Sequence, residues 1–127
     1  MRRQTVLILI CSLIVLGACS QEPATGNLQV ELQDGSLSPS ARSVIAGQVT
    51  LEAKNYGDFT HTLVVTAEGG EVIAASGLIP PGESQELELR LPPGNYQLSC
   101  RIVAQTEDGS LMDHFQLGMR AALRAEA

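Results

Sequence analysis

Residues 92–100 read Pro-Pro-Gly-Asn-Tyr-Gln-Leu-Ser-Cys, a turn followed directly by a strand pattern. The two prolines preset the backbone for the turn. After the turn, Tyr96, Leu98 and Cys100 recur at every second position, which puts their side chains on one face of a strand. The stretch predicts a strand that carries Cys100 on its core-facing side.

Short strand-like stretches of this kind recur along the rest of the chain. Apolar residues alternate with polar ones at 28–32, 49–53 and 87–91, and residues 63–65 form a short apolar run. Turn residues separate these stretches at Asp34-Gly35, Glu68-Gly69-Gly70, Pro80-Pro81-Gly82 and Asp108-Gly109. Short strands at this spacing are typical of an antiparallel sandwich or barrel.

The C-terminal residues 119–127 allow two interpretations. They are rich enough in alanine for a helix, but Met119, Ala121 and Leu123 also alternate as they would in a strand. We favour a closing strand. The sequence therefore predicts an all-β fold.

The N-terminus has the parts of an export signal. Two arginines precede an apolar stretch at residues 5–16 that is too short to span a bilayer. The following Leu16-Gly17-Ala18-Cys19 resembles the lipobox of bacterial lipoproteins, with an ordinary secretory signal as the alternative. We expect a signal peptide at 1–18, a lipid on Cys19, a flexible tether at 19–26 and one domain at 27–127.

This signal places the protein in the bacterial cell envelope, anchored to a membrane by its lipid, with the domain outside the cytoplasm. Ser20, in place of an aspartate, favours the outer membrane facing the periplasm in an organism with two membranes. Loss of the two basic residues of the signal changes the formal net charge from −6 to −8. Such an acidic surface disfavours nucleic acid as a partner. We expect a monomer.

Cys100 is the one thiol left free once Cys19 carries a lipid and the signal is removed. In an oxidising compartment a lone thiol is buried and inert, paired with another chain, or engaged in chemistry. The same domain holds His61, His114 and Met119. Two imidazoles, a thiolate and a weak thioether are the donors of an electron-transfer copper site, whereas zinc would not favour the thioether.

Each donor also has an ordinary structural explanation. A buried cysteine is commonly an inert small hydrophobe, and Met119 at an alternating position is commonly a core residue. His61 alone would be a hydrogen-bonded histidine at a strand end, and His114 an exposed loop residue. The combination of all four favours copper.

The segments around these donors resemble the cupredoxins, the blue-copper family of plastocyanin and azurin. Residues 55–65 look like the family's first ligand loop and strand, and residues 77–100 are similar to its late strands before the ligand cysteine. Gly118-Met119 after His114 matches the end of the site. The resemblance implies a single cupredoxin-like antiparallel Greek-key β-sandwich or barrel.

The resemblance also implies the site. Type 1 copper, cycling between Cu(I) and Cu(II), would be held by His61, Cys100, His114 and the axial Met119. Asn55 would bridge the two ligand loops by hydrogen bonds and fix His61, although simple turn chemistry is the alternative for Asn55.

One departure from the family is the thirteen residues, 101–113, between Cys100 and His114, where better-known members have only a few. A turn at 106–110 predicts a hairpin that folds out and returns, which would preserve the ligands. A disordered excursion would instead cost loop-closure entropy that metal binding would have to offset. The insertion could alternatively cover the copper or form a docking surface.

Enzyme signatures are absent from the sequence: it has no Gly-x-Ser-x-Gly elbow, phosphate-binding glycine loop or His-Glu-x-x-His helix. We therefore expect a non-enzymatic copper protein, a one-electron carrier at the membrane surface that exchanges electrons with a redox protein. The alternatives are a copper-trafficking or storage protein that hands copper to an acceptor, and a metal-free sandwich that binds other proteins.

Overall fold

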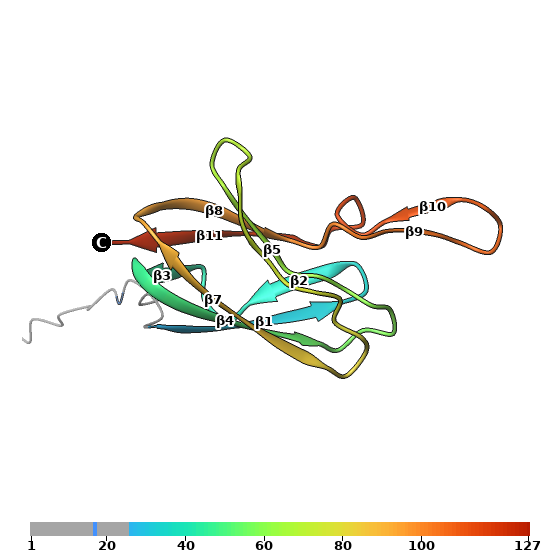
Figure 1. Ribbon diagram of the computed structural model, residues 1–127, viewed down its shortest axis with the longest axis horizontal. Coiled ribbons are helices and arrows are strands. Elements are labelled where there is room, and N and C mark those ends of the chain that lie inside the picture. The colour runs from blue at the N-terminus through green and yellow to red at the C-terminus, as the bar shows by residue number, and fades with distance from the viewer. Residues whose placement is uncertain (1–16, 18–25) are drawn as a thin grey trace, which may run out of the picture.

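The computed structural model describes Gly17 and residues 26–127. The predicted signal peptide, the tether and the lipidation site at Cys19 fall outside these residues, apart from Gly17 and Gly26. In the described part, the chain folds into two main sheets that face each other, and a hairpin extends beyond them (Figure 1). No helix among the described residues is long and apolar enough to cross a membrane.

The first sheet has four strands in the order β2-β1-β4-β7. Its strands are β1 (Asn27–Gln33), β2 (Ser36–Pro39), β4 (Gly47–Asn55) and β7 (Ser84–Leu91). The second sheet has five strands in the order β3-β11-β8-β5-β6. Its strands are β3 (Ser43–Ile45), β5 (Val64–Ala67), β6 (Val72–Ala75), β8 (Gly94–Ser99) and β11 (Arg120–Glu126).

The predicted strands are confirmed as β1, β4, β5, β7, β8 and β11, including the closing strand at the C-terminus. In β1 every second side chain is buried, because Leu28, Val30 and Leu32 face the opposite sheet. The strands β2, β3 and β6 were not predicted. Two of them have only four residues and β3 has three, too few for alternation to identify a strand.

Most strand pairs are antiparallel, as predicted, but two pairs are parallel, so the sheets are mixed. Strand β1 runs parallel to β4, and β3 runs parallel to β11. After β2 the chain crosses to the second sheet, forms β3 beside β11 and returns as β4 beside β1. A parallel pair requires such a crossover, and alternation within a strand carries no information about the direction of its neighbour.

The core lies between the two sheets, where the apolar faces of both meet. Leucines from each sheet, such as Leu51 of β4 and Leu98 of β8, are completely buried there. Cys100 and Met119 belong to the same buried cluster. The predicted placement of Cys100 on the core-facing side is confirmed.

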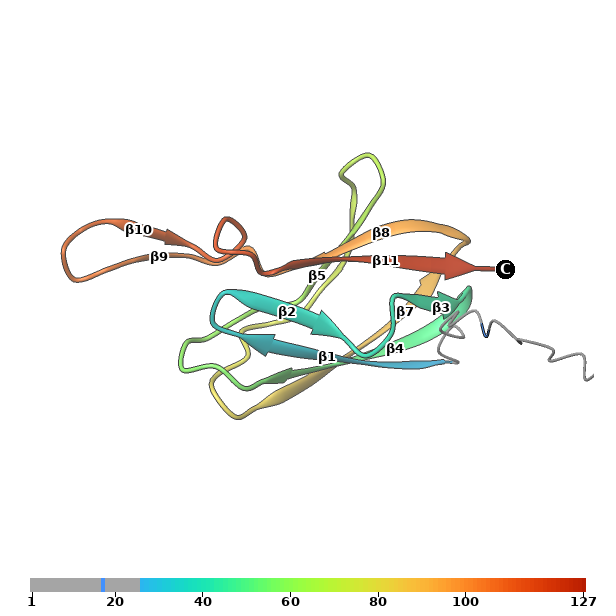
Figure 2. The ribbon, with the colours of Figure 1, turned by 180° about the vertical axis from the view of Figure 1, so that it is seen from behind.

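The insertion between Cys100 and His114 forms a hairpin of β9 (Val103–Gln105) and β10 (Leu111–Asp113), which projects away from the sandwich (Figures 1 and 2). Thr106 and Ser110 close its turn through a backbone hydrogen bond of 2.9 Å. At its base, the His114 amide donates to the Ile102 carbonyl at 3.0 Å. The predicted fold-out-and-return hairpin is confirmed, and it brings His114 back beside Cys100.

Candidate metal centre

Strand register brings the predicted ligand segments to one end of the second sheet. Ser99, the last residue of β8, pairs with Val64 of β5 on one side and with Arg120 of β11 on the other. Cys100 follows Ser99 directly, and Met119 precedes Arg120 directly. The segments that carry the donors therefore meet because the three strands are aligned.

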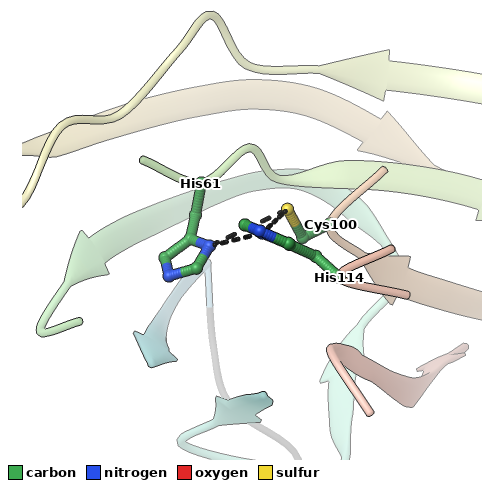
Figure 3. A group of neighbouring side chains, drawn as sticks. All are labelled: His61, Cys100 and His114. Carbon is green, nitrogen blue, oxygen red and sulfur yellow. Dashed lines mark hydrogen bonds between the residues drawn. The ribbon is translucent and has the colours of Figure 1, made fainter. Parts of the chain in front are cut away.

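His61, Cys100 and His114 converge in space, and their side chains point toward one another (Figure 3). The two Nδ1 atoms of the histidines are 3.1 Å apart. The Cys100 Sγ lies 3.6 Å from Nδ1 of His114 and 4.0 Å from Nδ1 of His61. One donor atom from each residue lies within 4.8 Å of the others, so a single metal ion can be shared by all three.

Backbone hydrogen bonds hold the three residues from different directions. His61 forms a β-bridge with Ile79, with N–H···O distances of 3.1 and 2.8 Å. The Cys100 amide donates to the Met119 carbonyl at 3.0 Å, and the Met119 amide donates to the His114 carbonyl at 3.1 Å. These bonds fix the positions of the residues independently of any bound ion.

The sulfur of Cys100 is buried and receives two contacts from Thr62. The Thr62 amide donates to Sγ at 3.4 Å, and the Thr62 hydroxyl approaches it at 3.7 Å. Both contacts hold the sulfur in place beside the two histidines. Sequence reasoning missed Thr62, although its position directly after a predicted ligand was a usable signal.

His61 makes a second polar contact on the side of its ring opposite to Cys100. Its Nε2 lies 2.9 Å from Oδ1 of Asp34, which belongs to the turn between β1 and β2. An ionised carboxylate only accepts, so Nε2 carries the proton, and in a neutral ring Nδ1 keeps its lone pair for a metal. The sequence pattern marked Asp34-Gly35 only as a turn, and nothing in it indicates that the carboxylate reaches a ligand.

Asp34 is itself held as a carboxylate. Partial burial would raise its pKa, but hydrogen bonds from the amides of Asp58 and Phe59 and from His61 outweigh burial and lower the pKa below its ordinary value. The amide distances are 2.9 Å to Oδ2 and 3.2 Å to Oδ1. The group is ionised at neutral pH and serves as an acceptor.

Asn55 is completely buried and organises the loop that leads to His61. Its side-chain amide donates to the carbonyls of Phe59 and Ile79, both at 2.8 Å, and its Oδ1 accepts from the Gly57 amide at 2.8 Å. These bonds join the His61 loop to the segment that forms the β-bridge with His61. These three bonds all lie within the His61 side of the site, and the bridge from Asn55 to the Cys100–His114 loop stays a prediction.

His114 is nearly buried, with 3% of its surface exposed. Burial, together with the neighbouring His61, lowers the pKa of His114 below its ordinary value despite the opposing effect of Asp34 and Asp113. The imidazole is therefore neutral at neutral pH. With the His61 proton on Nε2, Nδ1 of His114 donates to Nδ1 of His61, and a bound metal would replace that proton. A pocket of about 210 Å³ adjoins it, lined by Asp34, Gly35, Phe59, His61, Met112, His114 and Leu117.

Met119 is completely buried beside the ligand residues. Hydrogen bonds of its backbone link Cys100 to His114, as described above. Met119 directly precedes β11, at the end of the strand where the other donors lie. Its role as an axial ligand stays a prediction. Among the donors, the two imidazoles and the thiol form a set that suits a soft or borderline metal, and copper is the ion that accepts both kinds of ligand in two oxidation states.

A family model for the cupredoxin-like domain matches residues 6–112 of the sequence. The chain belongs to the cupredoxin family. The resemblance inferred from the ligand motifs is thereby confirmed. The matched stretch contains His61 and Cys100 and ends two residues before His114, so it is the structure that places His114 with the other two.

Several solved structures have the same fold at low sequence identity. Reduced auracyanin from Roseiflexus castenholzii is 17% identical with a TM-score of 0.62, over 82% of this chain and 99% of auracyanin. Auracyanin A from Chloroflexus aurantiacus, a blue copper protein, is 16% identical with a TM-score of 0.57, over 80% and 100%. Reduced rusticyanin is 15% identical with a TM-score of 0.60, over 84% and 82%.

These likenesses confirm the all-β cupredoxin-like sandwich, because at such identities a shared structure shows the fold alone. The fold is also found within larger enzymes: a multicopper oxidase matches over 42% of its own chain with a TM-score of 0.54. No curated protein matches the chain in sequence.

Proposed function

We propose that this cupredoxin is a one-electron carrier whose copper is held by His61, Cys100 and His114, with Met119 as the weak axial ligand. The observation that carries the proposal is the convergence of both histidines of the chain on Cys100, within 4.8 Å of one another and buried in the domain. Chance rarely buries two imidazoles around one thiol, because unpaired polar groups are costly in a core.

Copper bound there would supply one-electron exchange between Cu(II) and Cu(I). The chain's own residues would provide the rest. The Thr62 amide holds the sulfur of Cys100, Asp34 orients His61, and the backbone bonds among Cys100, His114 and Met119 keep the donors in place. Donors fixed before a metal arrives need little rearrangement when its charge changes, which favours rapid electron exchange.

The burial of the donor residues favours a carrier over a protein that delivers copper. A delivery protein must release its ion to an acceptor, which requires ligands that an acceptor can reach. Here Cys100 and His61 have no exposed surface, and His114 is only 3% exposed. We therefore place the copper in a resident site, and this domain acts without catalysing a reaction of its own.

The carrier would work at a membrane surface of the bacterial cell envelope, on the outer membrane facing the periplasm where two membranes exist. The support for this is the lipobox-like Leu16-Gly17-Ala18-Cys19 and the short stretch between Cys19 and the first strand at Asn27. The proposed partner is a redox protein, and we propose that the carrier itself is a monomer. Fatty-acid labelling that persists in a Cys19→Ser variant would contradict the anchor.

Voltammetry of the copper-loaded protein, combined with a chelator challenge, tests the carrier function. We expect a reversible one-electron wave and retention of copper in the presence of a Cu(I) chelator. An irreversible wave with rapid transfer of Cu(I) to the chelator would contradict a carrier and indicate trafficking.

A further inference from the structure

The Asp34–His61 pair is built more elaborately than a surface ion pair. His61 is completely buried, whereas the Asp34 side chain is 34% exposed, so the carboxylate reaches the ring from the solvent side. Two backbone amides of the loop that leads into His61 bind the same carboxylate. The first sheet, through its β1–β2 turn, thereby positions a ligand of the site at the end of the second sheet.

Gly57 shows how closely this pair is packed. A Cβ atom at position 57 would lie 2.3 Å from Oδ1 of Asp34 and 2.9 Å from Nε2 of His61, distances that real Cβ atoms do not show. Gly57 has no left-handed backbone, so the need for glycine here is the space taken by the carboxylate and the imidazole. The loop has room for the contact between Asp34 and His61 only because the residue at position 57 has no side chain.

We propose that Asp34 is a positioning residue for the copper site: its carboxylate keeps the His61 proton on Nε2, points the Nδ1 lone pair toward Cys100 and His114, and stabilises oxidised copper. This inference rests on the proposed function. A carboxylate bound to the outer nitrogen of a ligand histidine fixes its tautomer and raises its basicity. Because the carboxylate adds negative charge near the metal, it favours Cu(II) over Cu(I).

The test compares Asp34→Asn with Asp58→Asn in the purified full-length protein. Asp34→Asn keeps the shape of the side chain and removes its charge. Asp58→Asn is the matched control, because it removes one charge from an exposed residue of the loop that leads into His61, and in the described part of the chain the Asp58 side chain makes no hydrogen bond to His61. We expect Asp34→Asn to raise the ratio of reduced to oxidised copper about tenfold at a fixed potential, a shift of 59 mV for one electron.

The control should change that ratio by much less. Equal changes of the ratio in the two variants, or no change in Asp34→Asn, would overturn the role of Asp34. Neither result would contradict the proposed copper site. Asp34→Ala is the second variant if Asp34→Asn does not fold: it removes the same charge without crowding His61, and it should shift the ratio in the same direction. Gly57→Ala keeps every charge, but its Cβ would crowd both the Asp34 carboxylate and Nε2 of His61, so it reports on the contact between them.

Nitrogen-15 NMR of the histidine rings in the metal-free protein separates this proposal from the proposed function. Wild-type His61 should carry its proton on Nε2, and Gly57→Ala should give a mixture of tautomers. A proton on Nδ1 of wild-type His61 would overturn the role of Asp34 whether or not copper binds. Failure of the folded wild-type protein to bind copper would contradict the proposed function alone.

Discussion

At the scale of single residues, the site consists of the donors His61, Cys100 and His114 and of two groups that contact them, Asp34 and Thr62. Cys100, His61 and His114 could be predicted because thiol and imidazole groups are rare in this chain and chemically specific. Asp34 could not, because an aspartate in a turn has many structural uses. Thr62 offered only its position directly after a predicted ligand. Their contacts with His61 and Cys100 depend on loops that only the folded chain brings together.

The role of Met119 as an axial ligand can be tested by a single substitution. Met119→Leu nearly conserves the buried volume, so the free energy of unfolding should change by less than about 1.5 kcal/mol. If Met119 is the axial ligand, loss of its thioether removes electron density from copper, and the reduction potential should rise. Denaturant unfolding and voltammetry measure the two effects. An unchanged potential would show that Met119 is only a core residue.

At the scale of elements, alternation predicted the long strands and the hairpin, but not the pairing of the sheets. Strands β1, β4 and β8 bury every second residue, or nearly so, which the sequence shows directly. Strand β6 is mostly exposed at the edge of its sheet and shows no alternation. The parallel pairs arise from the crossover through β3, whose three residues contain too little pattern to be recognised.

Gly118 joins two of the elements around the site. Its φ is +114°, and a Cβ atom there would lie 2.8 Å from the carbonyl oxygen of Gly35, in the turn that carries Asp34. Gly118→Ala should therefore lower the free energy of unfolding by about 2–4 kcal/mol. Gly109→Ala is the control, since Gly109 also has positive φ but faces open space, and it should cost only about 1–2 kcal/mol. Equal losses in denaturant unfolding would show that packing between the turns is unimportant.

The tip of the β9–β10 hairpin should respond to acid. Hydrogen bonds from the side chains of Thr106 and Ser110 and from the Ser110 amide lower the pKa of Asp108 from 3.8 to about 2. Because the folded pKa is the lower one, the carboxylate stabilises the turn above pH 3.8, and this contribution is lost as the pH falls toward 2.

NMR titration of the Asp108 carboxyl carbon, with the amide shifts of Thr106 and Ser110, measures this change. Asp108→Asn should remove the pH dependence of those amides below pH 4. Titration of Asp108 near 3.8 in the folded protein would contradict the turn geometry.

At the scale of the whole molecule, the metal centre lies where both sheets contribute. His61 lies in the connection from β4 of the first sheet to β5 of the second, and Asp34 lies in the turn between β1 and β2. Cys100 and Met119 adjoin β8 and β11 of the second sheet. The sandwich thus holds a buried thiol and two imidazoles in place. The insertion projects from the sandwich as a hairpin and does not separate Cys100 from His114 (Figure 2).

The most direct measurement is the absorption spectrum of the purified protein after addition of Cu(II), with Cys100→Ala as the control. Copper shared by Cys100, His61 and His114 predicts an intense blue thiolate-to-copper band at one copper per chain, which Cys100→Ala lacks. Folded wild-type protein that shows no such band, or a band that persists in Cys100→Ala, would contradict the proposed copper centre.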